Sequence, residues 1–478
     1  MIIGLSRRDA VVILAATGVM ALAFAMVREQ VIPFHATVER QDYLLAGDEP
    51  EYLLGAWSLA HDGDLNLYNN VREKSWMVFQ KRDVCSIGHG ELAYFRRASP
   101  AMANASSEAW NGKQLLIHRP GTSVLISPAA LSKEHFRWWA YFIVAAVASL
   151  GVGVVLVLAV RAGLPAIPAS VLAVLLALSP PGLFYANQAY PEIPAAVLLA
   201  LAACFLLDSS PRVVVGSALC VAIAPWFSDR AILPAAALGL ACFWSARRSR
   251  ALPILLGIFG VGAVLLAMYY WRRFHVPWPV HHNWRYHASA ANIPALLPRV
   301  LLDRGRGLIW LCPALILLPA ALYSWWRSAM QRSLCVVVAL AVLAGLMGVA
   351  SFPDWEGGVC PAGRYGVIYQ WLALPAFFAW YRAGMSGKQK TLLLVALLAG
   401  AMISLLVVPH PSWWYRSYHP LFGYPFMDRF YDLLPSLGVA DVPSVMKAAA
   451  WAAVFALCNV LAVLPAHRPA LRTGGAER

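Results

Sequence analysis

Residues 138–160 read WWAYFIVAAVASLGVGVVLVLAV, a run without a charged side chain. An α-helix rises about 1.5 Å per residue, so a helix over this run is about 35 Å long. That length crosses the hydrocarbon core of a bilayer, which is about 30 Å thick. The run therefore predicts a transmembrane helix.

Apolar runs of this kind recur along the whole chain. They cover residues 11–27, 167–185, 193–207, 213–227, 231–245, 252–271, 307–326, 334–351, 365–381, 392–408 and 445–464. Several are short or contain proline, and the sequence SPPG at residues 179–182 should break or kink its helix. We therefore predict an all-α integral membrane protein with about 12 transmembrane helices, in which residues 1–478 form a single polytopic domain.

The first apolar run resembles a secretory signal peptide, because Arg7 and Arg8 precede it. It is long for a signal peptide, and no small-residue cleavage site follows it. We therefore predict an uncleaved first helix.

The composition agrees with a membrane protein. Of the 478 residues, 60% are hydrophobic and only 13% are charged, whereas soluble domains average about 25% charged residues. The net charge is +14, but the basic residues lie in loops between the apolar runs and form no stripe. We therefore expect membrane lipids, with their anionic headgroups, as partners, and no nucleic acid.

The basic residues are distributed unevenly between the two sets of loops. One side carries Arg7, Arg8, Arg161, Arg212, Arg247, Arg248, Arg250, Arg327, Arg332, Arg382, Lys388, Lys390, Arg468, Arg472 and Arg478. Its only acids are Asp9, Asp208 and Glu477. The positive-inside rule makes this side cytoplasmic, with both termini, in a plasma membrane or cell inner membrane. The loops 28–136, 272–306 and 410–442 then face the periplasm or exterior, and so does any active site.

The densest acidic cluster is DEPEYLL at residues 48–54, in the first external loop. Pro50 suits the first turn of a helix, with Asp48 or Glu49 as its N-cap. Apolar residues at helical spacing over residues 52–60 indicate a helix on the membrane surface. Asp48 is then either an N-cap alone or a general base for an acceptor hydroxyl. Two adjacent carboxylates can also raise the pKa of one of them.

Further polar residues interrupt the apolar pattern on the same side. Arg119 either clamps a phosphate or extends its charge to water. Glu192 is either a helix-start charge or a functional carboxylate at the edge of the hydrocarbon. The candidate substrate-binding residues are His118, Arg119, Tyr190, Glu192, Asp229, Arg230, Arg304, Glu356 and Arg364.

Other signals leave alternatives open or are negative. The histidines of residues 272–306 have no recognisable metal-ligand spacing, so no metal site is predicted there. Cys85 and Cys360 form either a disulfide or two free thiols. No GxSxG, Walker A or HExxH motif occurs.

Outward carboxylates, outward arginines and glycine-rich loops together fit a site for a lipid phosphate or pyrophosphate and a sugar.

Several of these features also occur in a fixed order over residues 40–380. They are Asp48-Glu49 after the first run, residues 118–128 before the second, Tyr190-Pro191-Glu192, Pro225-Trp226 with Arg230, residues 307–313, and residues 355–365 with Arg364. In order and sidedness the chain resembles the GT-C class of membrane glycosyltransferases. Within that class it is similar to the dolichyl-phosphate-mannose-protein mannosyltransferases and the lipid A aminoarabinose transferases. The resemblance implies a GT-C-like fold whose long first external loop carries surface helices.

The resemblance also implies an activity. Such an enzyme takes a sugar from a polyprenyl-phosphate carrier and gives it, with inversion, to a lipid, glycan or protein acceptor at the outer face. Asp48 would be the catalytic base with Glu49 as its helper, and Arg230 or Arg364 would bind the lipid phosphate. No cofactor is required, although a divalent cation at Asp48 and Glu49 is compatible with the class.

Two other functions are alternatives. One is a transporter or flippase of lipid-linked glycans, and the other is a non-catalytic assembly subunit. Transporters usually carry charges near the midplane and often contain inverted repeats. Because this chain has no clear repeat and its acids gather at one interface, an enzyme is favoured.

Overall fold

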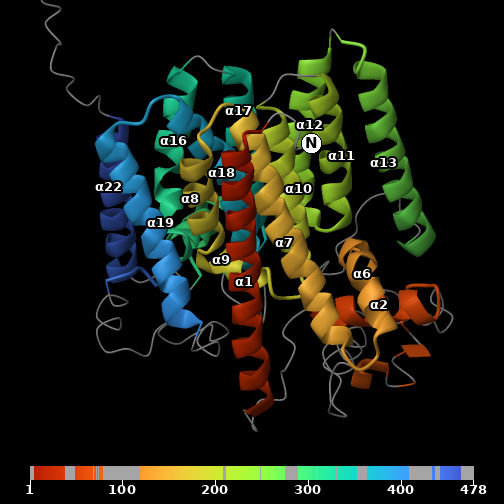
Figure 1. Ribbon diagram of the computed structural model, residues 1–478. Coiled ribbons are helices and arrows are strands. Elements are labelled where there is room, and N and C mark those ends of the chain that lie inside the picture. The colour runs from red at the N-terminus through yellow and green to blue at the C-terminus, as the bar shows by residue number, and fades with distance from the viewer. Residues whose placement is uncertain are drawn as a thin grey trace, which may run out of the picture.

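The computed structural model describes residues 5–37, 49–67, 69–70, 73, 75–78, 119–207, 211–247, 249–274, 289–304, 306–328, 331–352, 363–408, 433–436 and 442–463. Within these residues the regular structure is helical, and there is no β-strand. The long helices lie side by side in a bundle (Figure 1). The prediction of an all-α fold is therefore confirmed for this part of the chain.

The α-helices are α1 (Arg7–Thr37), α2 (Glu49–His61), α6 (Gly121–Ile126), α7 (Phe136–Arg161), α8 (Ala166–Ala177), α9 (Pro180–Tyr185), α10 (Glu192–Phe205), α11 (Pro211–Ile223), α12 (Ile232–Ala246), α13 (Leu252–Phe274), α14 (Ile293–Leu302), α15 (Leu308–Leu311), α16 (Leu318–Arg327), α17 (Arg332–Ala350), α18 (Val367–Arg382), α19 (Gly387–Val407) and α22 (Val442–Val463). Short 3-10 helices are η1 (Ser75–Val78), η2 (Ser127–Leu131), η3 (Ala224–Trp226), η4 (Asp229–Ala231), η5 (Ala290–Asn292), η6 (Pro313–Leu317) and η7 (Arg364–Gly366).

Six helices in the described residues are long and apolar enough to cross a membrane. They are the segments Arg7–Ala25, Phe136–Arg161, Leu252–Arg272, Arg332–Ala350, Gly387–Val407 and Pro443–Val463. On α13 the apolar side chains Val261, Val264 and Met268 are all more than half exposed. A continuous apolar surface of this kind suits contact with lipid rather than with water. The structure is therefore that of a multi-pass α-helical membrane protein.

The other predicted runs are also helical, but they are shorter or broken. Residues 167–185 form α8 and α9, and residues 307–326 form α15, η6 and α16. The count of about 12 spans therefore stays a prediction.

The break between α8 and α9 is where the Ser-Pro-Pro sequence predicts it. α8 ends at Ala177 and α9 begins at Pro180, so the last carbonyls of α8 lack the usual helical donors. The N–H of Ser179 donates to the carbonyl of Leu176, and that of Leu183 donates to the carbonyl of Ser179. Side chains of neighbouring helices supply further donors at the break. Gln370 Nε2, on α18, donates to the carbonyls of Leu176 and Ser179, and Ser404 Oγ, on α19, donates to that of Leu178. Because unpaired backbone groups are unfavourable inside a membrane, these bonds stabilise the break.

Helix α18 forms the centre of the bundle. Every residue from Val367 through Trp380 is buried, and the helix packs against α8, α10, α16 and α17. Its beginning therefore provides a fixed position from which the preceding residues project toward one end of the bundle.

At the end of the bundle opposite the beginning of α1 lie α2 and α6 (Figure 1). Ser123 Oγ joins them by donating to the carbonyl of Tyr52 at 3.0 Å. Every residue of α2 from Glu49 through Ser58 is buried. The sequence predicts a helix at this place with one apolar face on the membrane surface. The structure instead packs α2 on all sides over its first ten residues, against α6, η2 and η1 among others.

Candidate functional site

A buried ion pair joins the first residue of α10 to the residues that precede α18. Glu192 is fully buried, and its Oε1 accepts a hydrogen bond from Arg364 Nε at 2.7 Å. Arg364 is 5% exposed. The second oxygen of Glu192, Oε2, is buried and has no hydrogen-bond partner among the described residues. The structure thus brings together two candidate residues that lie far apart in the sequence.

Glycine is required immediately before this arginine. Gly363 has a φ of +80°, in the left-handed region that favours glycine. A Cβ at this position would lie 2.6 Å from Leu311 Cδ1 and 3.0 Å from Pro181 Cγ. The backbone at Gly363 therefore packs closely against α9 and α15, immediately before Arg364, which forms the ion pair with Glu192.

Aromatic rings surround the pair. The Arg364 guanidinium carbon lies 4.6 Å from the ring centre of Tyr190 and 5.5 Å from that of Tyr365. The Tyr190 ring makes edge contacts with Tyr52 at 6.4 Å and Tyr185 at 5.4 Å between centres. Candidate Tyr190 is therefore in contact with both α2 and the arginine.

A second ion pair ties α6 to η4. Arg119, which is 3% exposed, pairs with Asp229, whose carboxylate is 35% exposed. The Arg119 guanidinium also lies 4.6 Å from the ring centre of Tyr270. An arginine that extends its charge to water would be exposed, so the burial of Arg119 contradicts that alternative.

Arg230 differs from the other two arginines of this cluster. Its guanidinium carbon lies 3.1 Å from the ring centre of Tyr365. Within the described part of the chain no carboxylate lies at ion-pair distance from it, and its Nε is buried without a hydrogen bond. Arg119 and Arg364 are each paired with a carboxylate, whereas the contact that the described residues show for Arg230 is with the ring of Tyr365.

Arg230 lines a cavity of about 110 Å³ between α12 and α17. The other lining residues are Asp229, Leu233, Gly345, Gly348, Val349 and Phe352. The two glycines of α17 allow close packing beside the cavity, because a Cβ would lie 2.5 Å from Tyr369 Cε1 at Gly345 and 3.2 Å from Leu233 Cδ1 at Gly348. One end of the cavity is therefore charged, and its walls are otherwise apolar.

Glu49 fixes α2 to the loop that carries Tyr190. Its Oε1 accepts a hydrogen bond from the backbone N–H of Ala189 at 2.9 Å. Burial raises the pKa of Glu49, while the nearby charge of Arg137 and the bonds from Ala189 and Tyr141 partly oppose that shift. A carboxylate so engaged positions the loop, and its cationic neighbour makes it a poor ligand for a divalent cation.

Among the described residues no three His, Cys, Asp or Glu side chains come together as a metal site.

Several predicted residues lie outside the described part. They are Asp48, His118, Glu356, Cys85 and Cys360. Arg304 lies between α14 and α15, and its backbone N–H donates to the carbonyl of Pro435 at 2.9 Å.

Two residues near the cluster, Arg306 and Tyr270, were not predicted from the sequence. Arg306 is 7% exposed and lines a small cavity of about 20 Å³ together with Arg364 and Tyr365. Its proximity in sequence to Arg304, within one Asp-Arg-Gly-Arg stretch, was an available signal. Tyr270 lies in an apolar run that gave no signal of its own.

Comparison with family models, curated proteins and solved structures gives no match. What the cluster does is therefore inferred from its own residues.

Proposed function

We propose that this protein is a membrane glycosyltransferase with a GT-C-like architecture of about 12 spans. It would transfer a sugar, with inversion, from a polyprenyl-phosphate carrier to an acceptor hydroxyl at the outer face. The observation that carries the proposal is Arg230, an arginine without a carboxylate partner among the described residues, at the charged end of an otherwise apolar cavity.

Arg230 is the residue best suited to bind the lipid phosphate. Arginine recognises phosphate through several N–H donors, and such charge-assisted bonds are stronger than neutral ones. Arg364, the alternative from the resemblance, already donates to Glu192. The apolar walls at Leu233 and Val349 suit the first prenyl units, and the rest of the tail would lie in the bilayer.

In the proposed reaction the acceptor oxygen attacks the anomeric carbon of the sugar. The bond between that carbon and the phosphate oxygen breaks, and its electron pair leaves with the polyprenyl phosphate. Asp48 takes the acceptor proton, as the resemblance implies, and no step needs a metal. Arg230 stabilises the charge that develops on the leaving phosphate in a partly dry site.

The buried pairs position this machinery. Glu49, next to Asp48 in the chain, bonds to Ala189 and so holds the start of α2 beside Tyr190. Glu192 and Arg364 hold the starts of α10 and α18 together. Asp229 and Arg119 hold α6 against the segment that carries Arg230.

The test uses the purified protein in proteoliposomes with a radiolabelled polyprenyl-phosphate sugar. We expect product with the wild type, and a loss of about 100- to 1,000-fold in kcat/KM for Arg230→Gln. Arg272→Gln removes an exposed arginine near the same end, on α13, and should retain activity. Unchanged transfer by Arg230→Gln would exclude this phosphate site. Movement of the labelled lipid across the bilayer without product would indicate a flippase. If the wild type neither forms product nor moves the lipid, an assembly subunit would be indicated.

A further inference from the structure

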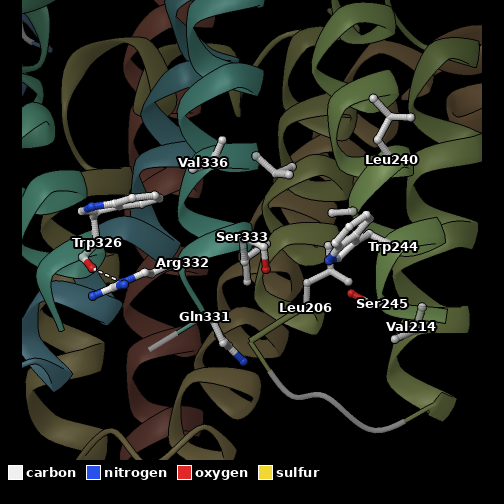
Figure 2. A pocket seen from close by; sticks show the side chains of 13 residues that line it. Leu206, Val214, Leu240, Trp244, Ser245, Trp326, Gln331, Arg332, Ser333 and Val336 are labelled. Atoms are coloured by element: carbon white, nitrogen blue, oxygen red, sulfur yellow. Dashed lines mark hydrogen bonds between the residues drawn. The ribbon is translucent and has the colours of Figure 1, made fainter. Parts of the chain in front are cut away.

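A larger groove lies at the other end of the bundle, where the cytoplasmic side is predicted. It has a volume of about 610 Å³, within the range typical of ligand sites. α11, α12, α16 and α17 contribute to it, together with the segment after α10 (Figure 2). None of its lining residues belongs to the cluster around Arg230.

The groove is apolar along its walls and polar at one end. Leu240 and Val336 lie on facing helices, and Ser333, Gln331 and Arg332 lie where α17 begins (Figure 2). This gradient suits an amphipathic occupant whose chain lies among the helices and whose head lies at the helix ends.

Two arginine–tryptophan pairs flank the groove. Arg332 Nε donates to the carbonyl of Trp326 at 3.1 Å, and its guanidinium carbon lies 5.6 Å from the centre of that ring. Arg247 Nη1 donates to the carbonyl of Trp244 at 2.8 Å, and its guanidinium carbon lies 3.7 Å from that ring centre. Both tryptophans line the groove (Figure 2).

The two pairs give the groove a cationic rim. Both arginines are exposed, and neither has a carboxylate partner among the described residues. Each bond to a tryptophan carbonyl uses one nitrogen of the guanidinium and leaves the others accessible. A phosphate at this end of the groove would therefore meet positive charge from Arg332, which lines the groove, and from Arg247, which stacks on the lining residue Trp244.

We propose that this groove binds one anionic phospholipid of the cytoplasmic leaflet. An acyl chain lies between α12 and α17, and Arg247 and Arg332 hold the headgroup phosphate. Tryptophan side chains at this depth suit the boundary between headgroups and hydrocarbon. The proposal is independent of the reaction proposed above.

The test measures lipids retained by the purified full-length protein, using native mass spectrometry after incubation with equal amounts of phosphatidylglycerol and phosphatidylcholine. We expect one phosphatidylglycerol per protein to be retained in preference. The Arg247→Gln/Arg332→Gln double variant should lose that retention at least tenfold. Arg161→Gln/Arg382→Gln removes two exposed arginines at the same end, away from the groove, and should retain the lipid.

A second variant tests the apolar part. Val336→Trp places a large ring in the groove at a position that is 39% exposed, and it should displace the lipid while both arginines remain. Equal retention of the two lipids by the wild type would overturn the proposal. Retention of phosphatidylglycerol by the Arg247→Gln/Arg332→Gln variant would also overturn it. An equal loss of phosphatidylglycerol in the Arg161→Gln/Arg382→Gln variant would do the same, because it would indicate diffuse electrostatic attraction. If Val336→Trp does not fold, the two charge variants still decide.

Discussion

Glu192 Oε1 accepts a hydrogen bond from Arg364 Nε at 2.7 Å, between residues 172 positions apart in the chain. Both side chains are buried, so the pair closes the junction between α10 and α18. A buried ion pair contributes less to net stability than its geometry suggests, but loss of one partner leaves the other charge uncompensated. This asymmetry leads to the first prediction.

Glu192→Gln should destabilise the protein by about 3–5 kcal/mol, because Arg364 loses its carboxylate. The double variant Glu192→Gln/Arg364→Met removes both charges and should recover most of the stability without recovering transfer. Thermal unfolding in detergent measures the first effect, and the proteoliposome assay measures the second. A single variant as stable as the wild type contradicts a stabilising role for the pair.

Tyr365 should support the donor phosphate through Arg230. Tyr365→Leu removes a cation–π contact worth about 0.5–2 kcal/mol, and should raise the KM for the lipid donor about 2- to 30-fold. Tyr365→Phe keeps the ring and is the matched control. Steady-state kinetics over a range of donor concentrations distinguish the two variants, and an equal KM for both would rule out this contact.

The stability of the protein should depend on pH through Glu49. Burial raises the pKa of this carboxyl above its ordinary value of about 4.5. Its favourable contribution is therefore complete below that value and is lost as the pH rises through the raised pKa. We expect Glu49→Gln to gain in Tm relative to the wild type as the pH increases from 4 to 8. Parallel Tm profiles for Glu49→Gln and the wild type over this pH range would contradict the prediction.

Gly363 should tolerate no side chain. Gly363→Ala combines a left-handed backbone, which costs about 1–2 kcal/mol for alanine, with contacts to Leu311 and Pro181 that are too short. Gly384 has a φ of +92°, and a Cβ added there would meet nothing within 4 Å, so Gly384→Ala should show the backbone effect alone. Comparison of the two Tm values isolates the packing effect, and equal losses would show that the close passage is unimportant.

The break between α8 and α9 should depend on Gln370. Gln370→Leu removes a side-chain donor from the carbonyls of Leu176 and Ser179, which keep their backbone bonds from Ser179 and Leu183. The expected cost is therefore about 0.5–1.5 kcal/mol for each hydrogen bond lost. Ser149→Ala is the control, because Ser149 Oγ donates only to the carbonyl of Ala145 within its own helix. Chemical unfolding should separate the two variants, and a Gln370→Leu protein as stable as the control would contradict this role.

The helices were predictable because their signal is local. A long uncharged run such as residues 138–160 specifies a helix long enough to span a membrane. Pro180 interrupts its helix whatever the surrounding packing, because proline has no backbone N–H to donate. The start of α2 also follows from local signals, since Pro50 lies in its first turn. The burial of α2 on all sides did not follow, because it depends on segments far along the chain.

The partners within the site were not predictable for the same reason. Arg119 and Asp229 are 110 positions apart, and nothing in either local sequence identifies the other. The sequence offered Arg230 and Arg364 equally as phosphate ligands. Only the packing of α10 against α18 shows that one has a carboxylate partner, which leaves the other as the stronger candidate.

The bonds at the break between α8 and α9 have a mechanical consequence. Ser404, which donates to the carbonyl of Leu178, belongs to the same unbroken helix as Lys388, near the basic end of the bundle. A displacement of α19 along its axis is therefore transmitted through this side chain to the joint before α9, and from there toward Tyr185 and Tyr190. Because Gln370 and Ser404 tie this joint to two neighbouring helices, we expect a fixed bend here instead of a loose hinge.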